Sequence, residues 1–226
     1  MSEIKHPEHL KHKKTAAESW MLYQERYGKQ TLIAVALLLI ITGGYLGYKH
    51  YVQEPKENLA SEAMFRAENY YRMDSVNLAL NGDNVNAGFI KIISRYNGTD
   101  AARLSAFYAG SCCLKLGEYS NAVKYLKDFS TPALQVQAKA YGLLGDAYSE
   151  LNKKEDAVAA YKKAGTTFEK DDVISPEYLF RAGYLYESMG KDKEAIEMYQ
   201  LVKDKYPASQ RGFDIDRYLA RLGVVK

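Results

Sequence analysis

Hydrophobic positions follow two different patterns along this chain of 226 residues. Near the N-terminus they form one long uncharged run, Thr31 to Tyr48, which is apolar on every face of a helix. Further along they recur at helical spacing among polar residues, as in amphipathic helices that pack against one another. The pattern therefore predicts an all-α protein in which a single transmembrane helix precedes a larger helical domain.

The uncharged run has the length of a membrane span. As a helix it would extend about 27 Å, and residues up to Val52 can lengthen it, so a transmembrane helix is expected over 31–52. A cleaved signal peptide is the alternative, but thirty residues precede the run and no small-x-small site follows it before Lys49. Acylation as a lipoprotein is excluded because the only cysteines, Cys112 and Cys113, lie far downstream. An uncleaved anchor is therefore favoured.

Basic residues near the two ends of the span predict its orientation. Residues 11–30 carry five, Lys11, Lys13, Lys14, Arg26 and Lys29, and residues 49–68 carry three, Lys49, Lys56 and Arg66. This bias places a short tail, residues 1–30, in the cytoplasm and the C-terminal domain across the membrane. In a bacterium this means a single-pass protein of the inner membrane with a periplasmic domain. Trp20, Tyr23 and Tyr27 indicate an amphipathic segment at the membrane interface just before the span.

Helix-length segments after residue 100 repeat one another. Gly110, Gly145 and Gly183 stand 35 and 38 residues apart, and each is followed at matching offsets by an alanine and by a large apolar residue. The alanines are Ala122, Ala157 and Ala195, and the large residues are Leu126, Tyr161 and Tyr199. Small residues let the two helices of a repeat approach closely, and we expect the large residue to fill the gap between neighbouring repeats. The recurring tyrosines are interpreted as solenoid core; an aromatic cage for a cofactor is the less favoured alternative.

These positions resemble the tetratricopeptide repeat family, over about Arg103 to Pro207. The resemblance implies an α-solenoid with about three full repeats over 101–208. A degenerate helix pair is expected over 53–100, with one helix from about Glu57 to Leu80 that has Met73 where a small residue belongs. Its second helix would place Val85, Phe89, Ile92 and Tyr96 like the matching residues of the last repeat. A capping helix is expected within 209–226, at about Gly212 to Leu222.

The register also predicts which side chains face the inner, concave side of the solenoid. We expect partner binding by Leu104, Phe107, Ser111, Leu114, Lys115, Lys139, Asp146, Glu150, Phe180, Tyr184 and Glu187. Gly142, Ser149, Glu177 and Ser188 share the same inner positions. The set is apolar at its ends and acidic in its middle, so it lacks the basic clamp with which some tetratricopeptide adaptors hold a carboxylate. Its apolar residues either bind a partner segment or lie under neighbouring helices, and the sequence leaves both alternatives open.

Composition points away from catalysis and nucleic acid. The net charge of +3 is small, and basic residues alternate with acidic ones, so no nucleic-acid partner is expected. No histidine follows His50, and the adjacent pair Cys112 and Cys113 is interpreted as core packing. His6, His9 and His12 are interpreted as part of a solvated tail, not a metal site. Neither a cofactor, a small-molecule substrate nor an enzymatic activity is predicted.

The combination of one span with a tetratricopeptide domain is similar to the YfgM-like ancillary subunit family of the SecYEG translocon. That resemblance implies a non-enzymatic adaptor beside the protein-conducting channel, which passes emerging, unfolded chains to periplasmic chaperones. The alternative is a scaffold for a secretion, outer-membrane assembly or cell-wall complex. The sequence alone does not decide between them.

Overall fold

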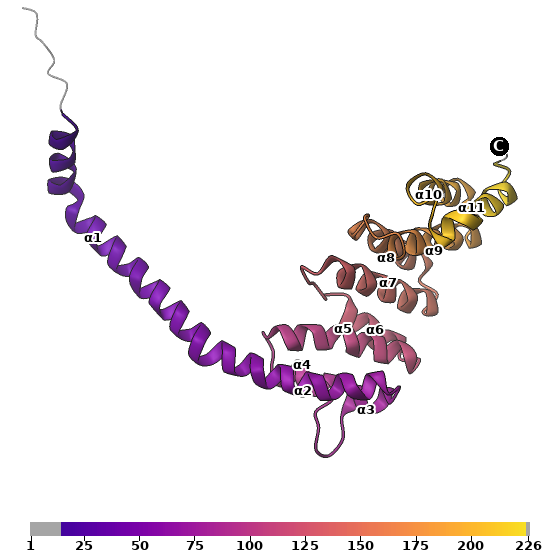
Figure 1. Ribbon diagram of the computed structural model, residues 1–226, viewed down its shortest axis with the longest axis horizontal. Helices are drawn as coiled ribbons and strands as arrows, with labels where there is room; N and C mark the ends of the chain where they lie inside the picture. The colour runs from indigo at the N-terminus through magenta and orange to yellow at the C-terminus, as the bar shows by residue number, and fades with distance from the viewer. Residues whose placement is uncertain (1–14, 225–226) are drawn as a thin grey trace, which may run out of the picture. The chain divides into compact units, whose positions relative to one another are not determined.

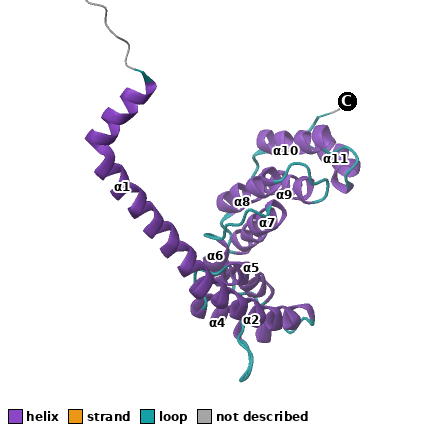
Figure 2. Cartoon of the chain, turned by 60° about the vertical axis from the view of Figure 1, so that its left-hand side comes forward, coloured by secondary structure: helices purple, strands orange, loops and turns teal. Residues whose placement is uncertain are grey.

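The computed structural model describes residues 15–224, and all regular structure in that range is helical (Figure 2). The helices are α1 (Ala16–Tyr48), the π-helical turn η1 (Lys49–Gln53), α2 (Glu54–Arg72), α3 (Val76–Asn81), α4 (Phe89–Arg95), α5 (Asp100–Lys115), α6 (Tyr119–Leu126), α7 (Leu134–Glu150), α8 (Lys154–Thr167), α9 (Ile174–Ser188), α10 (Asp192–Lys205) and α11 (Gln210–Arg221). The chain divides into two compact units, residues 1–54 and 55–226.

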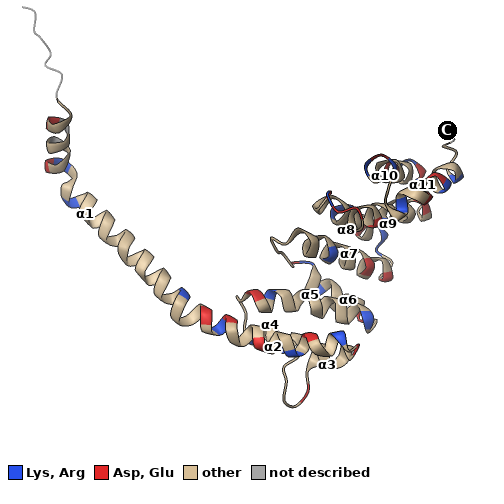
Figure 3. Ribbon diagram, in the orientation of Figure 1, with Lys and Arg blue, Asp and Glu red and all other residues tan. Residues whose placement is uncertain are grey.

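The first unit consists of α1 and η1. Thr15 caps α1, because its hydroxyl accepts a hydrogen bond from the Glu18 amide while the Glu18 carboxylate accepts one from the Thr15 amide. The helix is long and apolar enough to cross a membrane, and its middle carries no charged side chain (Figure 3). Residues such as Leu38 and Ile41 are about two-thirds exposed within the chain, so nothing in this unit covers them. The expected interfacial segment with Trp20 belongs to the same continuous helix.

The second unit is a solenoid of helix pairs, α5 with α6, α7 with α8 and α9 with α10 (Figure 1). In each pair the predicted glycine lies directly under the large residue of the second helix. An added Cβ would stand 2.4 Å from Leu126 at Gly110, 2.5 Å from Tyr161 at Gly145 and 2.7 Å from Tyr199 at Gly183. Only glycine permits such an approach, so the expected register agrees with the packing.

The position of the large residue differs from the expectation in one respect. We expected Tyr161 to fill the gap between repeats, but its ring lies mainly against Gly145 of its own repeat. Its other face stacks on Tyr178 of the next repeat, with ring centroids 6.2 Å apart. The tyrosine hydroxyl reaches past the glycine and donates a hydrogen bond of 2.7 Å to Asp146. One side chain therefore joins both helices of its repeat and the next repeat.

The N-terminal part of this unit departs from the expected helix pair. The expected helix over Glu57 to Leu80 is interrupted between α2 and α3, where Asp74 has a positive φ of 55° and Met73 is exposed. Val85 lies in a loop and is 88% exposed, so its expected place in a second helix was wrong. The physical reason is local: the loop 82–88 carries glycine at both ends, and a Cβ at Gly88 would stand 2.2 Å from the Gly82 nitrogen. Phe89 and Ile92 are buried, as their matching positions predict.

The last helix, α11, closes the solenoid. Ser209 caps it by accepting a hydrogen bond of 3.0 Å from the Gly212 amide. Ile215 and Leu219 are fully buried against the last repeat, together with Tyr199 and Val202. The capping helix was therefore expected at nearly the right residues. Its outer face instead exposes Phe213, at 77%.

Candidate protein-binding face

The predicted inner residues divide into three groups by exposure. Those exposed to solvent are Lys115, Lys139, Glu150 and Tyr184. Those partly buried are Leu104, Phe107, Leu114, Asp146 and Glu187. Ser111 and Phe180 are buried. Only the first group is exposed to a partner of this chain, and within it Lys115 is already paired with Asp74.

Phe180 is a core residue, contrary to the expectation that it offers a binding anchor. Its ring lies 4.7 Å from that of Tyr218, and the guanidinium of Arg211 stacks over it at 4.1 Å. Both covering residues belong to α11. The sequence alone leaves open whether neighbouring helices cover the apolar inner positions; at Phe180 the C-terminal helix covers one of them.

A second cover lies at the other end of the solenoid. The Tyr71 hydroxyl of α2 lies 2.8 Å from the Ser111 hydroxyl, and Lys115 forms an ion pair of 2.9 Å with Asp74. Phe107 is partly buried, with its ring 5.7 Å from that of Phe129. The inner positions of α5 are therefore engaged by α2 and by the core, which withdraws Ser111 and much of Phe107 from partner binding.

Gly142 is also closed, because the ring of Tyr178 occupies the space beside it. A Cβ at this position would stand 1.9 Å from the Tyr178 ring, so the missing side chain admits a residue of the next repeat. Burial raises the pKa of Tyr178 to about 12, which keeps its hydroxyl neutral. This aromatic residue forms part of the inner surface that the sequence analysis did not identify.

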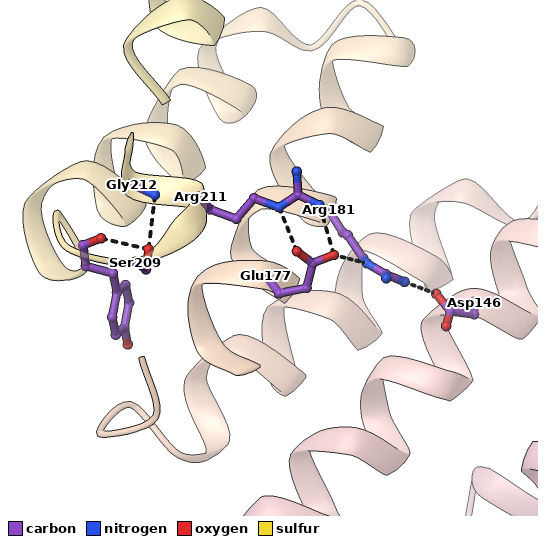
Figure 4. Close-up of polar contacts among 7 residues, drawn as sticks. Asp146, Glu177, Arg181, Ser209, Arg211 and Gly212 are labelled. Atoms are coloured by element: carbon purple, nitrogen blue, oxygen red, sulfur yellow. Dashed lines mark hydrogen bonds and ion pairs between the residues drawn. The ribbon is translucent and has the colours of Figure 1, made fainter. Parts of the chain in front are cut away.

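Alternating charges cross the inner face from α7 to α11 (Figure 4). Arg181 donates hydrogen bonds of 2.8 Å to both Asp146 and Glu177. Arg211 then donates to the two oxygens of Glu177, at 2.6 and 3.2 Å. We call these four residues, Asp146, Arg181, Glu177 and Arg211, the charge ladder. Its hydrogen-bonded guanidinium groups join α7, α9 and α11, which follow one another along the inner face.

The charge ladder changes the expected electrostatics of the face. Burial raises the pKa of Glu177, but the hydrogen bonds from Arg211 and Arg181 outweigh it, so the net effect is a lowered pKa. Burial alone would lower the pKa of Arg181, but the contacts with Glu177 and Asp146 raise it. Two carboxylates are thus matched by two guanidinium groups. Of the two acidic residues expected in the middle of the face, Asp146 is therefore neutralised by Arg181, whereas Glu150 stays exposed.

Glu187 is engaged in the same way. It accepts hydrogen bonds of 2.9 Å from the Tyr199 hydroxyl and 2.8 Å from Arg221. None of the three arginines in these contacts, Arg181, Arg211 and Arg221, was among the predicted inner residues. Their signal is the spacing between repeats: Arg181 follows Asp146 by 35 residues, and Arg211 follows Glu177 by 34.

The accessible part of the inner face is therefore narrower than expected. A hollow of about 350 Å³ lies at the N-terminal ends of α9 and α11, and it includes Lys139, Tyr178 and Arg211. Apolar residues Ile174 and Pro176 also line it. Tyr184, 55% exposed, lies further along α9. This combination of aromatic, apolar and cationic groups suits contact with a polypeptide segment.

Groups that could hold a metal or act as a nucleophile are few among the described residues. Residues 15–224 contain no cluster of three metal-ligating side chains, and His6, His9 and His12 lie outside the described range. Cys112 and Cys113 are buried, and burial raises their pKa values to about 12 and 11. Such thiols remain protonated near neutral pH and serve as packing groups.

Comparisons with known proteins agree with this architecture. Two family profiles, each described as tetratricopeptide repeat, match residues 138–164 and 177–209. The crystal structure of MamA protein superposes with a TM-score of 0.56 at 20% sequence identity, over 73% of this chain and 83% of that chain. No curated protein sequence matches the chain. The chain therefore contains tetratricopeptide repeats, and the expected all-α solenoid fold is confirmed.

Proposed function

We propose that this protein is a membrane-anchored adaptor of the Sec translocon. Tetratricopeptide repeats imply a protein-interaction scaffold, and the observation that carries the proposal is the repeat array with an accessible inner hollow and with Tyr184 exposed further along α9. The domain binds segments of other proteins and performs no chemistry of its own. Its expected ligands are emerging, unfolded chains or periplasmic chaperones, which expose short apolar segments.

The proposed localisation is the bacterial inner membrane. The support is the long apolar helix α1 and the five-to-three bias of basic residues, although Lys11, Lys13 and Lys14 lie outside the described range. On this basis residues 1–30 form the cytoplasmic tail and 31–52 the span. Residues 53–100 hold the degenerate N-terminal helices, 101–208 the repeats and 209–226 the cap. Contact with SecYEG is assigned to the span, and client binding to the periplasmic domain.

Affinity purification of the full chain from mild detergent, with mass spectrometry, tests this proposal. We expect SecYEG subunits and periplasmic folding factors to co-purify with the wild type. The variant Lys139→Glu/Tyr184→Ser should lose the folding factors and keep SecYEG, since both residues lie on the accessible inner face. A matched control, Lys193→Glu/Phe213→Ser, changes exposed residues elsewhere and should keep both.

Other outcomes would overturn the proposal. The scaffold hypothesis would be favoured if, in place of SecYEG, components of cell-wall, secretion or outer-membrane assembly complexes co-purify. Equal loss of the folding factors in both variants would show that the inner face carries no binding site.

A further inference from the structure

A second hollow lies at the N-terminal end of the solenoid. It has a volume of about 380 Å³ and is bounded by α2, by the loop 82–88 and by α4. Its apolar lining includes Leu59, Ala63 and Val85, and its basic lining includes Arg66, Lys91 and Arg95. We call these six residues the N-terminal patch. None of them belongs to the inner face described above.

The loop holds Val85 in solvent by specific contacts. One Asp83 oxygen accepts hydrogen bonds from the amides of Val85 and Asn86, at 2.7 and 2.5 Å. The other accepts a bond of 2.6 Å from the Tyr70 hydroxyl of α2. The loop thus presents a branched apolar side chain that is 88% exposed, beside Leu59, which is 58% exposed on the same hollow. In Figure 1 the chain that connects α3 and α4 projects as a loop from the N-terminal end of the solenoid.

The charges beside Val85 are mainly positive. Arg66 forms an exposed ion pair of 3.2 Å with Glu62, an acidic residue that also lines the hollow. Within residues 15–224, no carboxylate lies at ion-pair distance from Lys91 or Arg95, although Arg95 stacks over Tyr96 at 5.5 Å. The Asp83 carboxylate is directed to donors within the loop and to Tyr70. The N-terminal patch is therefore suited to a ligand with anionic and apolar parts.

The short connection between the expected span and α2 keeps a ligand of this kind, the lipid bilayer, close to the patch. Leu59 follows Val52, the end of the expected span, by seven residues, which reach at most about 25 Å even when extended. A bilayer that holds α1 is thus always within reach of α2, at a high effective concentration. It presents anionic phosphates above an apolar layer, which matches the two components of the patch.

We propose that the N-terminal patch docks on the anionic headgroups of the bilayer that holds the anchor. Lys91, Arg95 and Arg66 contact phosphates, and Val85 and Leu59 enter the interfacial region. The proposal rests on the membrane anchoring assumed in the proposed function. Docking would keep the first repeats against the membrane.

The test uses the full chain with a fluorescent NBD label at Asn84→Cys, next to Val85. The native cysteines are buried, so the introduced thiol is the one accessible to the label. The protein is placed in nanodiscs of phosphatidylcholine alone or with one-third phosphatidylglycerol. We expect a blue-shifted emission and at least twofold quenching by headgroup-region spin-labelled lipid in the phosphatidylglycerol discs only.

Charge-reversal variants identify the surface responsible. Lys91→Glu/Arg95→Glu should abolish the shift and the quenching, and Val85→Asp should reduce them. The matched control Lys170→Glu/Lys193→Glu makes the same change of net charge at exposed residues of the later repeats and should leave both signals intact. Circular dichroism should report the same helicity for all variants.

Three results would overturn the docking proposal. The first is an NBD emission in nanodiscs that equals the emission in detergent. The second is the same blue shift and quenching in both lipid compositions. The third is a blue shift and quenching that Lys91→Glu/Arg95→Glu retains. A label that responds to an acidic peptide but not to lipid gives the first result and would assign the patch to a protein. Extraction of the chain from vesicles by alkaline carbonate would instead refute the anchor, whereas a resistant chain with an unresponsive label refutes docking alone.

Discussion

At the scale of single residues, the repeat packing depends on the absence of a side chain at three glycines. Gly145→Leu would add four side-chain carbons, the first of them only 2.5 Å from the Tyr161 ring. We expect a loss of about 1–3 kcal/mol in the free energy of unfolding, measured by urea denaturation. Ala220→Leu, on the exposed side of α11, should change it by less than about 0.5 kcal/mol. Equal values for the two variants would contradict the packing.

Substitutions at two phenylalanines, one buried and one exposed, test whether α11 covers the inner face. Phe180→Ser removes a ring packed under Tyr218 and Arg211, and we expect a loss of about 3 kcal/mol from the lost burial and the cavity. Phe213→Ser removes a ring that is 77% exposed and should cost less than about 0.5 kcal/mol. Thermal or urea unfolding distinguishes them. A harmless Phe180→Ser would mean that α11 leaves the face open in solution.

At the scale of secondary-structure elements, the charge ladder couples α7, α9 and α11. Glu177→Gln leaves two guanidinium groups facing a neutral amide, and we expect a loss of about 1 kcal/mol, since these side chains remain partly solvated. Glu197→Gln, on the exposed face of α10, should be neutral within about 0.5 kcal/mol. The measurement is urea unfolding at pH 7.

The same carboxylate predicts a dependence on pH. The pKa of Glu177 is lower in the folded than in the unfolded protein, so its contribution is complete above the unfolded value of about 4.5. It is lost as the pH falls from there through the folded pKa. The difference in stability between wild type and Glu177→Gln should therefore be constant near neutral pH and shrink as the pH falls below about 4.5. A difference that persists at low pH would assign the effect to packing.

At the scale of the whole molecule, the anchor and the bias of basic residues predict the side of the membrane on which the repeats lie. External protease added to bacterial spheroplasts should digest residues after the span and leave a membrane-held N-terminal fragment. The reason is that the more basic end of a span remains in the cytoplasm. A C-terminal domain that stays protected in intact spheroplasts, but is digested once they are lysed, would place it in the cytoplasm and end the translocon proposal.

Much of the fold followed from periodicity. The glycines, alanines and large residues recur because every helix pair meets the same steric demand, so each repeat confirms the others. The first helices lack this redundancy. Met73 and Val85 were placed by analogy with later repeats, whereas the positive φ at Asp74 and the glycine-bounded loop 82–88 determine the real path.

The inner face was predicted less well, because exposure depends on neighbours that no single helix specifies. Register placed Phe180 and Tyr184 on the same face, yet α11 buries the first and leaves the second exposed. Register likewise placed Asp146 and Glu177 on this face, but Arg181 of α9 neutralises the first, and Arg211 of α11 shares the second with Arg181.

The sequence by itself determined the helical class, the apolar span, the repeats and their glycine contacts, since these follow from short-range patterns of size and polarity. Only the tertiary structure decided which inner residues a partner can reach and which charges remain unpaired. Burial and ion pairing arise between side chains more than thirty residues apart, such as Arg211 with Glu177. Which side chains are buried or paired depends on how successive helices stack, and the sequence pattern within one helix does not specify this.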